Sequence, residues 1–152
     1  MDNLEVVLRS NLDHYMDDVN TSLVGVVVGV QRLNKGLIDV QPVANNYFPD
    51  GEFAEYPVIR NVQVIMPSTS TSSITMPVKQ GDNVLLVFSQ RDISAFKSGA
   101  ITAHNPPTSR TFNINDAVAI VGLFPTNKTK LSPTEHVNDF DNESLVITHN
   151  IG

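Results

Sequence analysis

The fold is decided by residues 77–89, which read PVKQGDNVLLVFS. Gly81 marks a turn after the proline, and an unbroken apolar run follows it. A run of this kind, bounded by turn residues and rich in Val and Leu, is typical of a strand buried in a protein core. Because side chains alternate along a strand, the interior positions expected in this run and in residues 116–125 are Val84, Leu86, Phe88, Val118 and Ile120.

Further strand signals lie on both sides of this run. Residues 23–30 are dense in β-branched side chains and lead through turn residues 33–36 into a second apolar stretch at residues 37–43. This pattern predicts a β-hairpin. The remaining strands or strand pieces are expected at residues 56–59, 62–66, 116–125 and 145–151, with residues 45–55 as a loop.

A different period at the N-terminus predicts a helix. Apolar residues recur at three- and four-residue steps from Leu4 to Val19 and form one stripe. With about six strands and frequent turn signals, the chain is expected to be mainly β, a small closed barrel, although the pattern alone also allows a two-sheet sandwich. The expected domains are an N-terminal helix at residues 1–20, a barrel at residues 21–126, and a linker with a C-terminal strand at residues 127–152.

The composition narrows the classes of function. The 152 residues carry a formal net charge of −6 and ten Lys and Arg residues. This balance disfavours nucleic acid and anionic membrane surfaces as partners, because both attract basic proteins. The chain has no cysteine, which excludes disulfides and thiolate sites. There is no apolar run of roughly 20 residues and no signal-peptide pattern, so synthesis and folding in a cytoplasm are expected.

No spacing of polar residues indicates catalysis, a cofactor or a metal. The four histidines lie far apart, so they form no local set of metal ligands. The acidic stretch at residues 139–143 lacks the further ligands and the glycine of a calcium loop. A small hydrolase that uses Asp116, Asp139 or His136 is the weakest alternative, because no catalytic motif surrounds these residues. We therefore expect no enzymatic activity.

Two motifs resemble a known family. The first is P-x-x-x-G-D-x-V-L-x-x-F at residues 77–88, and the second is R-x-F-x-x-x-D-A-x-x-x-x-G-x-x-P at residues 110–125. Together they are similar to the N-terminal domain of the baseplate central-spike, or cell-puncturing, proteins of contractile-tail phages. That domain is an oligonucleotide/oligosaccharide-binding (OB) barrel. The signature residues that carry the resemblance are Gly81, Asp82, Arg110, Phe112, Asp116, Ala117, Gly122 and Pro125.

The resemblance implies an OB-type barrel in a structural subunit of the virion, located in the tail baseplate and made in the host cytoplasm. In that family a homotrimer lies beneath the tail hub and tube, and a β-helical needle normally follows the barrel. The implied function is the central spike, or its OB-fold adaptor, which joins hub and tube to the tip that pierces the host outer membrane. The 152 residues hold no needle repeats and no His-x-His tip motif. Either the chain is truncated before a needle, or a separate tip protein carries it.

The C-terminal strand is expected to begin the threefold structure below the barrel. Leu145, Ile147 and Ile151 fall on one face of residues 145–151. We expect these three side chains to pack around the trimer axis. A sixth barrel strand or a frayed tail is the alternative.

The alternative function is a single-stranded nucleic-acid-binding OB module. OB barrels that bind single strands stack bases on aromatic side chains within a basic groove. Here the aromatic cluster at residues 47–56 is interspersed with acidic residues. The cluster favours protein contact, with packing in the core as the alternative, and no nucleic-acid partner is expected.

Overall fold

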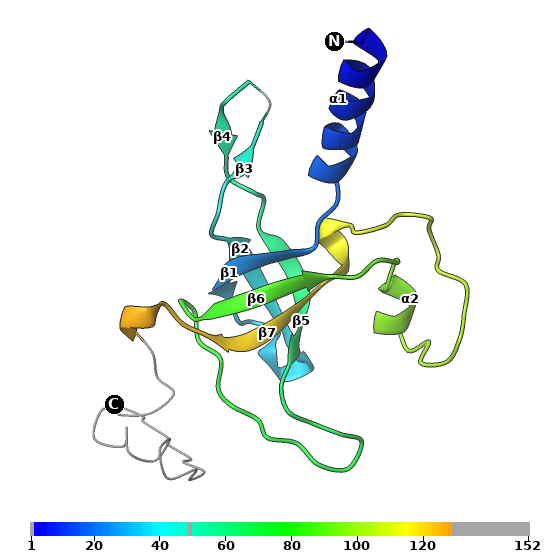
Figure 1. Cartoon of the computed structure of the whole chain (residues 1–152). Helices are drawn as coiled ribbons and strands as arrows, with labels where there is room; N and C mark the ends of the chain where they lie inside the picture. The colour runs from blue at the N-terminus through cyan, green and yellow to red at the C-terminus, as the bar shows by residue number, and fades with distance from the viewer. Residues whose placement is uncertain (1, 49, 129–152) are drawn as a thin grey trace, which may run out of the picture. The chain divides into compact units, whose positions relative to one another are not determined.

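The computed structural model of the chain describes residues 2–48 and 50–128 (Figure 1). The chain divides into two units, residues 1–122 and 123–152, and nearly all described elements belong to the first. In chain order the elements are α1 (Asn3–Asp17), β1 (Ser22–Gly29), η1 (Leu33–Lys35), β2 (Leu37–Pro42), β3 (Asn46–Tyr47), β4 (Phe53–Ala54), β5 (Ile59–Ile65), β6 (Asn83–Phe88), α2 (Ser94–Lys97), η2 (Ile114–Asp116), β7 (Ala117–Leu123) and η3 (Thr126–Lys128). None of the described helices is both long and apolar enough to cross a membrane.

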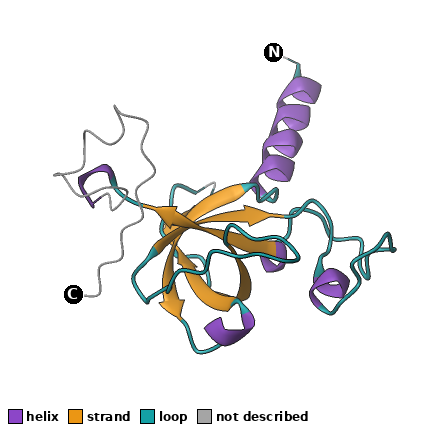
Figure 2. Ribbon diagram, turned by 90° about the horizontal axis from the view of Figure 1, so that it is seen from below, coloured by secondary structure: helices purple, strands orange, loops and turns teal. Residues whose placement is uncertain are grey.

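Five strands close into a barrel in the order β1-β2-β5-β7-β6. β1 pairs antiparallel with β2 and β6, β2 pairs antiparallel with β5, and β5 pairs parallel with β7. Figure 2 shows these strands curled around one centre. This is an OB-type barrel. The prediction of a mainly β fold with an N-terminal helix is confirmed, and the two-sheet sandwich is excluded. Residues 45–55, expected to be a loop, contain the two-stranded sheet of β3 and β4.

The barrel interior is apolar. Val84, Leu86 and Phe88 of β6 are buried, as their alternation predicted. Gly25 of β1 lets the wall close tightly, because a Cβ at this position would overlap the Val40 side chain. The core consists of Val27, Ile38, Val40, Ile59, Val62, Val78, Val84, Leu86, Phe88, Ala117 and Ala119.

The interior face of β7 is the opposite of the one predicted. Ala117 and Ala119 are buried, whereas Val118 is half-buried and Ile120 is 40 % exposed. The pairing with β5 sets this register, because Ala119 lies beside Val64, which packs against the core. Large side chains from the other strands fill the interior, so the smallest residues of β7 fit there. The prediction of Val118 and Ile120 as interior positions was therefore wrong.

The corrected register of β7 can be tested by changing side-chain volume on each face. Ala119→Leu should lower the free energy of unfolding by about 1–3 kcal/mol, because it overpacks a filled interior. Ile120→Val should lower it by less than about 0.5 kcal/mol, since an outer-wall methylene contributes little. Urea unfolding of both variants measures these changes. If Ile120→Val lowered the free energy of unfolding more than Ala119→Leu, the result would support the sequence-based assignment of Ile120 to the interior.

α1 forms where the periodic apolar stripe predicted it. The Asp2 carboxylate accepts a hydrogen bond from the Leu4 N–H at 3.2 Å and so caps the first turn. Glu5 and Arg9 form an ion pair at 3.6 Å, one turn apart. The apolar residues of the helix are each at least half exposed: Leu4, Val6, Val7, Leu8, Leu12, Tyr15 and Met16.

Candidate functional site

The second signature motif begins with Arg110 in the connection from β6 to β7 and continues through β7. The Arg110 guanidinium donates two hydrogen bonds to the Asp116 carboxylate, from Nε to Oδ2 at 2.8 Å and from Nη2 to Oδ1 at 2.7 Å. Nη2 also donates to Oδ1 of Asp92 at 3.0 Å. Both carboxylates are buried, and the Arg110 side chain is 31 % exposed. Because the two aspartates lie at opposite ends of the connection, Arg110 ties these ends together.

Asp92 is the most heavily hydrogen-bonded member of this network. Its carboxylate accepts from the Ser94 hydroxyl at 2.6 Å, the Ser94 N–H at 2.9 Å and the Thr108 hydroxyl at 2.7 Å. The Ser94 hydrogen bonds first, then Thr108 and the charge of Arg110, hold the pKa of Asp92 well below its usual range. The hydrogen bond to Asp116 raises the pKa of Arg110. Every buried side-chain nitrogen or oxygen in the described residues has a hydrogen-bond partner. The network around Arg110 therefore fixes the long connection between β6 and β7.

The lowered pKa of Asp92 makes folding stability depend on acid pH. A carboxyl whose pKa is lower in the folded state stabilises the fold fully above its unfolded pKa of about 3.9, and this stabilisation is lost as pH falls towards the folded pKa. We expect the melting temperature of the unmodified chain to drop more steeply between about pH 4 and about pH 2 than that of Asp92→Asn, which cannot titrate there. Thermal melts across this range measure the difference, and parallel curves would contradict the expectation.

The first signature motif fixes the start of β6. Gly81 has a φ of 97°, a left-handed conformation that favours glycine, and its N–H donates to the Val27 carbonyl at 2.8 Å. The Asp82 carbonyl accepts from the Val27 N–H at 2.8 Å, and its carboxylate accepts from the Lys79 N–H at 2.9 Å. The Gly-Asp pair therefore makes the turn and attaches it to β1.

The remaining signature residues also have structural positions. The Phe112 carbonyl accepts two hydrogen bonds from Asn20, from its N–H at 3.3 Å and from Nδ2 at 2.9 Å. Ala117 belongs to the core, Gly122 has a φ of 97° near the end of β7, and Pro125 is exposed beyond that strand. The two motifs are thus brought to the walls and connections of one barrel.

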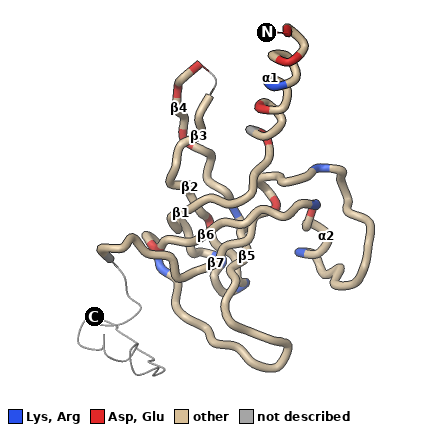
Figure 3. Tube along the Cα trace, viewed as in Figure 1, with Lys and Arg blue, Asp and Glu red and all other residues tan. Residues whose placement is uncertain are grey.

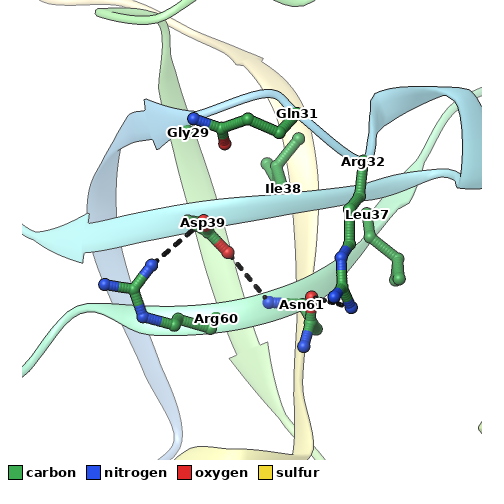
Figure 4. Close-up of a pocket in the computed structure, with 8 residues that line it drawn as sticks. All are labelled: Gly29, Gln31, Arg32, Leu37, Ile38, Asp39, Arg60 and Asn61. Carbon is green, nitrogen blue, oxygen red and sulfur yellow. Dashed lines mark hydrogen bonds and ion pairs between the residues drawn. The ribbon is translucent and has the colours of Figure 1, made fainter.

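A polar pocket of about 160 Å³ lies between the β1–β2 hairpin and β5 (Figure 4). Asp39 accepts from the Asn61 N–H at 3.1 Å and pairs with Arg60 at 3.4 Å. The side-chain oxygen of Asn61 accepts a hydrogen bond from Arg32 at 3.2 Å. The backbone carbonyl of Asn61 accepts one from Lys97 at 2.6 Å. Asn61 has a φ of 55°, which asparagine tolerates better than most residues.

This pocket was not predicted from the sequence, although it left a signal. The polar pair Arg60-Asn61 interrupts the apolar residues that form β5, and the register between β2 and β5 shifts beside it. In the structure the polar groups of the pocket bind one another. Partial burial lowers the pKa of Lys97, and the charge of Asp116 opposes this shift. Asp39 and Arg60 form an ion pair within the pocket. The polar side chains of the pocket therefore bind one another around the irregular pairing of β2 with β5.

The described residues leave several apolar surfaces uncovered. Tyr47 and Phe53 contact each other across the β3–β4 sheet, with ring centroids 5.1 Å apart, and both are exposed. Ile65 and Ile120 are neighbours on the outer wall of the barrel and are also exposed. Figure 3 shows acidic residues along α1 and the β3–β4 arm, the segment from β3 to β4. The surfaces of α1 and of the β3–β4 arm combine apolar side chains with carboxylates and suit contact with other proteins.

Several predicted residues lie outside the described residues. They are Leu145, Ile147 and Ile151, expected at a trimer axis, and Asp139 and His136 of the hydrolase alternative. The C-terminal strand at residues 145–151 likewise stays a prediction. Within residues 2–48 and 50–128, no group of three or more His, Asp or Glu side chains could hold a metal ion.

Comparison with known proteins agrees with the location of the signature. A search of curated proteins found no match to this chain. The family model described as "Phage protein Gp138 N-terminal domain" matches residues 25–122, which run from within β1 to the penultimate residue of β7 and contain all the signature residues but the last. The match covers more than half of the chain. The chain therefore belongs to the Gp138 N-terminal domain family of phage proteins.

Proposed function

We propose that the chain is a structural subunit of a phage tail baseplate, the central spike or its OB-fold adaptor. In this role it joins the tail hub and tube to the tip that pierces the host cell envelope. Membership of a phage protein family and the OB-type barrel support the proposal. The subunit acts as a homotrimer in the virion and contacts hub and tail-tube proteins. A separate needle or tip protein is a further partner where the needle is not part of the same chain, and contact with the host outer membrane is transient.

The observation that carries this proposal is the distribution of apolar side chains. Among the described residues, more large apolar side chains are exposed than are buried in the core. Isolated exposed apolar residues are ordinary, but contiguous groups on a monomer indicate contact surfaces. Here they form groups on α1, on the β3–β4 arm and on the outer wall at Ile65 and Ile120. A subunit that works by assembly needs such surfaces.

We propose no catalytic role and no cofactor for the chain. The buried carboxylates of Asp92 and Asp116 are both held by Arg110, and Asp92 has a strongly lowered pKa. A general acid or base works best with a pKa near the operating pH. A carboxylate that stays ionised at the centre of an ion-pair network serves structure instead.

The proposed location can be tested on phage particles that carry the protein. Gold-labelled antibodies raised against the purified chain should bind at the distal end of the tail in electron micrographs. Antibodies first absorbed with the purified chain provide the control. Label confined to the capsid or to the sides of the tail would contradict a baseplate location.

Single-stranded nucleic-acid binding is the alternative function, and one feature favours it. Arg32, Arg60 and Lys97 gather around Asn61 at one end of the barrel. Fluorescence anisotropy with a labelled single-stranded oligonucleotide separates the two functions. We expect no binding at physiological salt, because Asp39 pairs with one of these cations and the whole chain is acidic. Micromolar binding that weakens as salt increases would favour the alternative.

A further inference from the structure

We propose that α1 is a self-association element, in which the helices of neighbouring copies pack side by side and parallel, with Asn11 of each copy at the same level. The number of copies, three, rests on the proposed function. The inference itself concerns α1, a segment outside the match to the phage family at residues 25–122.

The apolar stripe of α1 has the spacing of a helix-packing seam. Leu4, Leu8, Asn11 and Tyr15 follow one another at steps of four, three and four residues, which keeps them on one face of a helix. The apolar side chains on this seam and beside it are all more than half exposed: Leu4, Val7, Leu8, Leu12 and Tyr15. A 15-residue helix is only marginally stable alone in water. Burial of this stripe against a partner would supply the missing stability.

The charges of α1 allow its own copies to be that partner. Asp13 lies on the face opposite the seam, by helix periodicity, whereas Glu5 and Arg9 flank the seam beside Leu8 and pair with each other at 3.6 Å. The seam itself carries no charged residue. Copies of the helix can therefore meet along the seam without burying a charge, with the Glu5–Arg9 pair at its edge and Asp13 in solvent.

Asn11 distinguishes a parallel bundle from burial in an apolar groove. Its side-chain amide has both donors and acceptors, and a buried amide without partners is unfavourable. In an apolar groove, such as the one lined by Leu33, Val64 and Met76, an amide placed among apolar side chains would lose its hydrogen bonds. In a parallel bundle each Asn11 meets the Asn11 of its neighbours, and their amides can bond one another. A single polar residue in a helix seam is known to fix register and orientation in this way.

A matched pair of variants in the full chain tests the inference. Leu8→Asp places a charge in the seam, whereas Val6→Asp places the same charge on the opposite face; the two side chains are 58 % and 50 % exposed. By analytical ultracentrifugation, Val6→Asp should keep the mass of the unmodified assembly, and Leu8→Asp should lower it. The barrel should melt as before in both, because the described α1 side chains contribute nothing to the core.

Orientation is tested by cysteine cross-linking, which is simple because the chain has no cysteine. Under mild oxidation, Leu4→Cys should give a disulfide-linked band at twice the chain mass, because only parallel helices place the two Leu4 positions at the same level. Val6→Cys, on the opposite face, should give little. If Leu8→Asp keeps the full mass, or if Leu4→Cys cross-links no better than Val6→Cys, the inference is overturned while the trimeric spike can still stand. A tail-tip label that is missing although α1-dependent association persists would overturn only the proposed function.

Discussion

Arg110→Ala is expected to destabilise the barrel by about 3–5 kcal/mol, because it leaves the buried carboxylate of Asp116 without its charged partner. The Asp116 side chain is 1 % exposed and receives two hydrogen bonds from the guanidinium. Water that enters the space left by the guanidinium can replace hydrogen bonds to Asp116, but it cannot replace the positive charge. The loss should appear as a lower urea midpoint with an unchanged slope.

Two further variants separate the ion pair from a general effect of charge. Arg91→Ala removes an exposed arginine from the same connection and should change stability by less than about 0.5 kcal/mol. Arg110→Lys keeps the positive charge but loses the planar fork that binds a carboxylate through two atoms, so it should recover only part of the loss. If Arg110→Ala unfolds at the same urea concentration as Arg91→Ala, the network does not hold the loop.

Leu86→Ala is expected to lower the free energy of unfolding by about 2–5 kcal/mol, because it leaves a cavity in a filled core. Leu86 is fully buried, and β1 approaches it closely: a Cβ at Gly25 would lie 3.3 Å from its Cδ1. The backbone at Gly25 is fixed by pairing with both β2 and β6. The surrounding wall therefore has little freedom to collapse into the space.

The adjacent leucine provides the control for this experiment. Leu85→Ala makes the same chemical change one residue earlier, on the opposite face of β6, where the side chain is only half-buried. We expect it to destabilise the barrel clearly less than Leu86→Ala. Equal losses in the two variants would mean that the interior face of β6 is misassigned.

The sequence predicted the fold wherever one strong local signal decided it. The unbroken apolar run of β6 and the alternation of Val84, Leu86 and Phe88 required only that a strand be buried on one face. The three- and four-residue period of α1 was equally local. In β6 the pattern of side chains and the final environment agree, whereas in α1 the pattern predicted the helix but its apolar side chains are exposed.

The sequence failed to predict features that depend on contacts between distant segments of the chain. In β7, alternation along the strand suggested Val118 and Ile120 as interior, but pairing with β5 places Ala119 inside. Arg110 and Asp92 are 18 residues apart in an irregular connection, so no periodicity could have paired them. The Arg60-Asn61 bulge appeared in the sequence only as a break between two apolar pieces. These features depend on how the barrel closes.

The resemblance of the sequence to a known family identified the signature residues, and the structure shows the physical role of each. Gly81 is needed for a left-handed turn, and Arg110 with Asp116 forms an ion pair. None of this required a ligand. The prediction for Leu145, Ile147 and Ile151 stays open, since these residues lie outside the described part of the chain.

The central claim is that the chain acts by assembling into a trimer, and the mass of the full chain in solution tests it most directly. Light scattering during size-exclusion chromatography, repeated over a range of loading concentrations, should give about three times the chain mass of 16.6 kDa. A mass of 16.6 kDa at every concentration would contradict the claim.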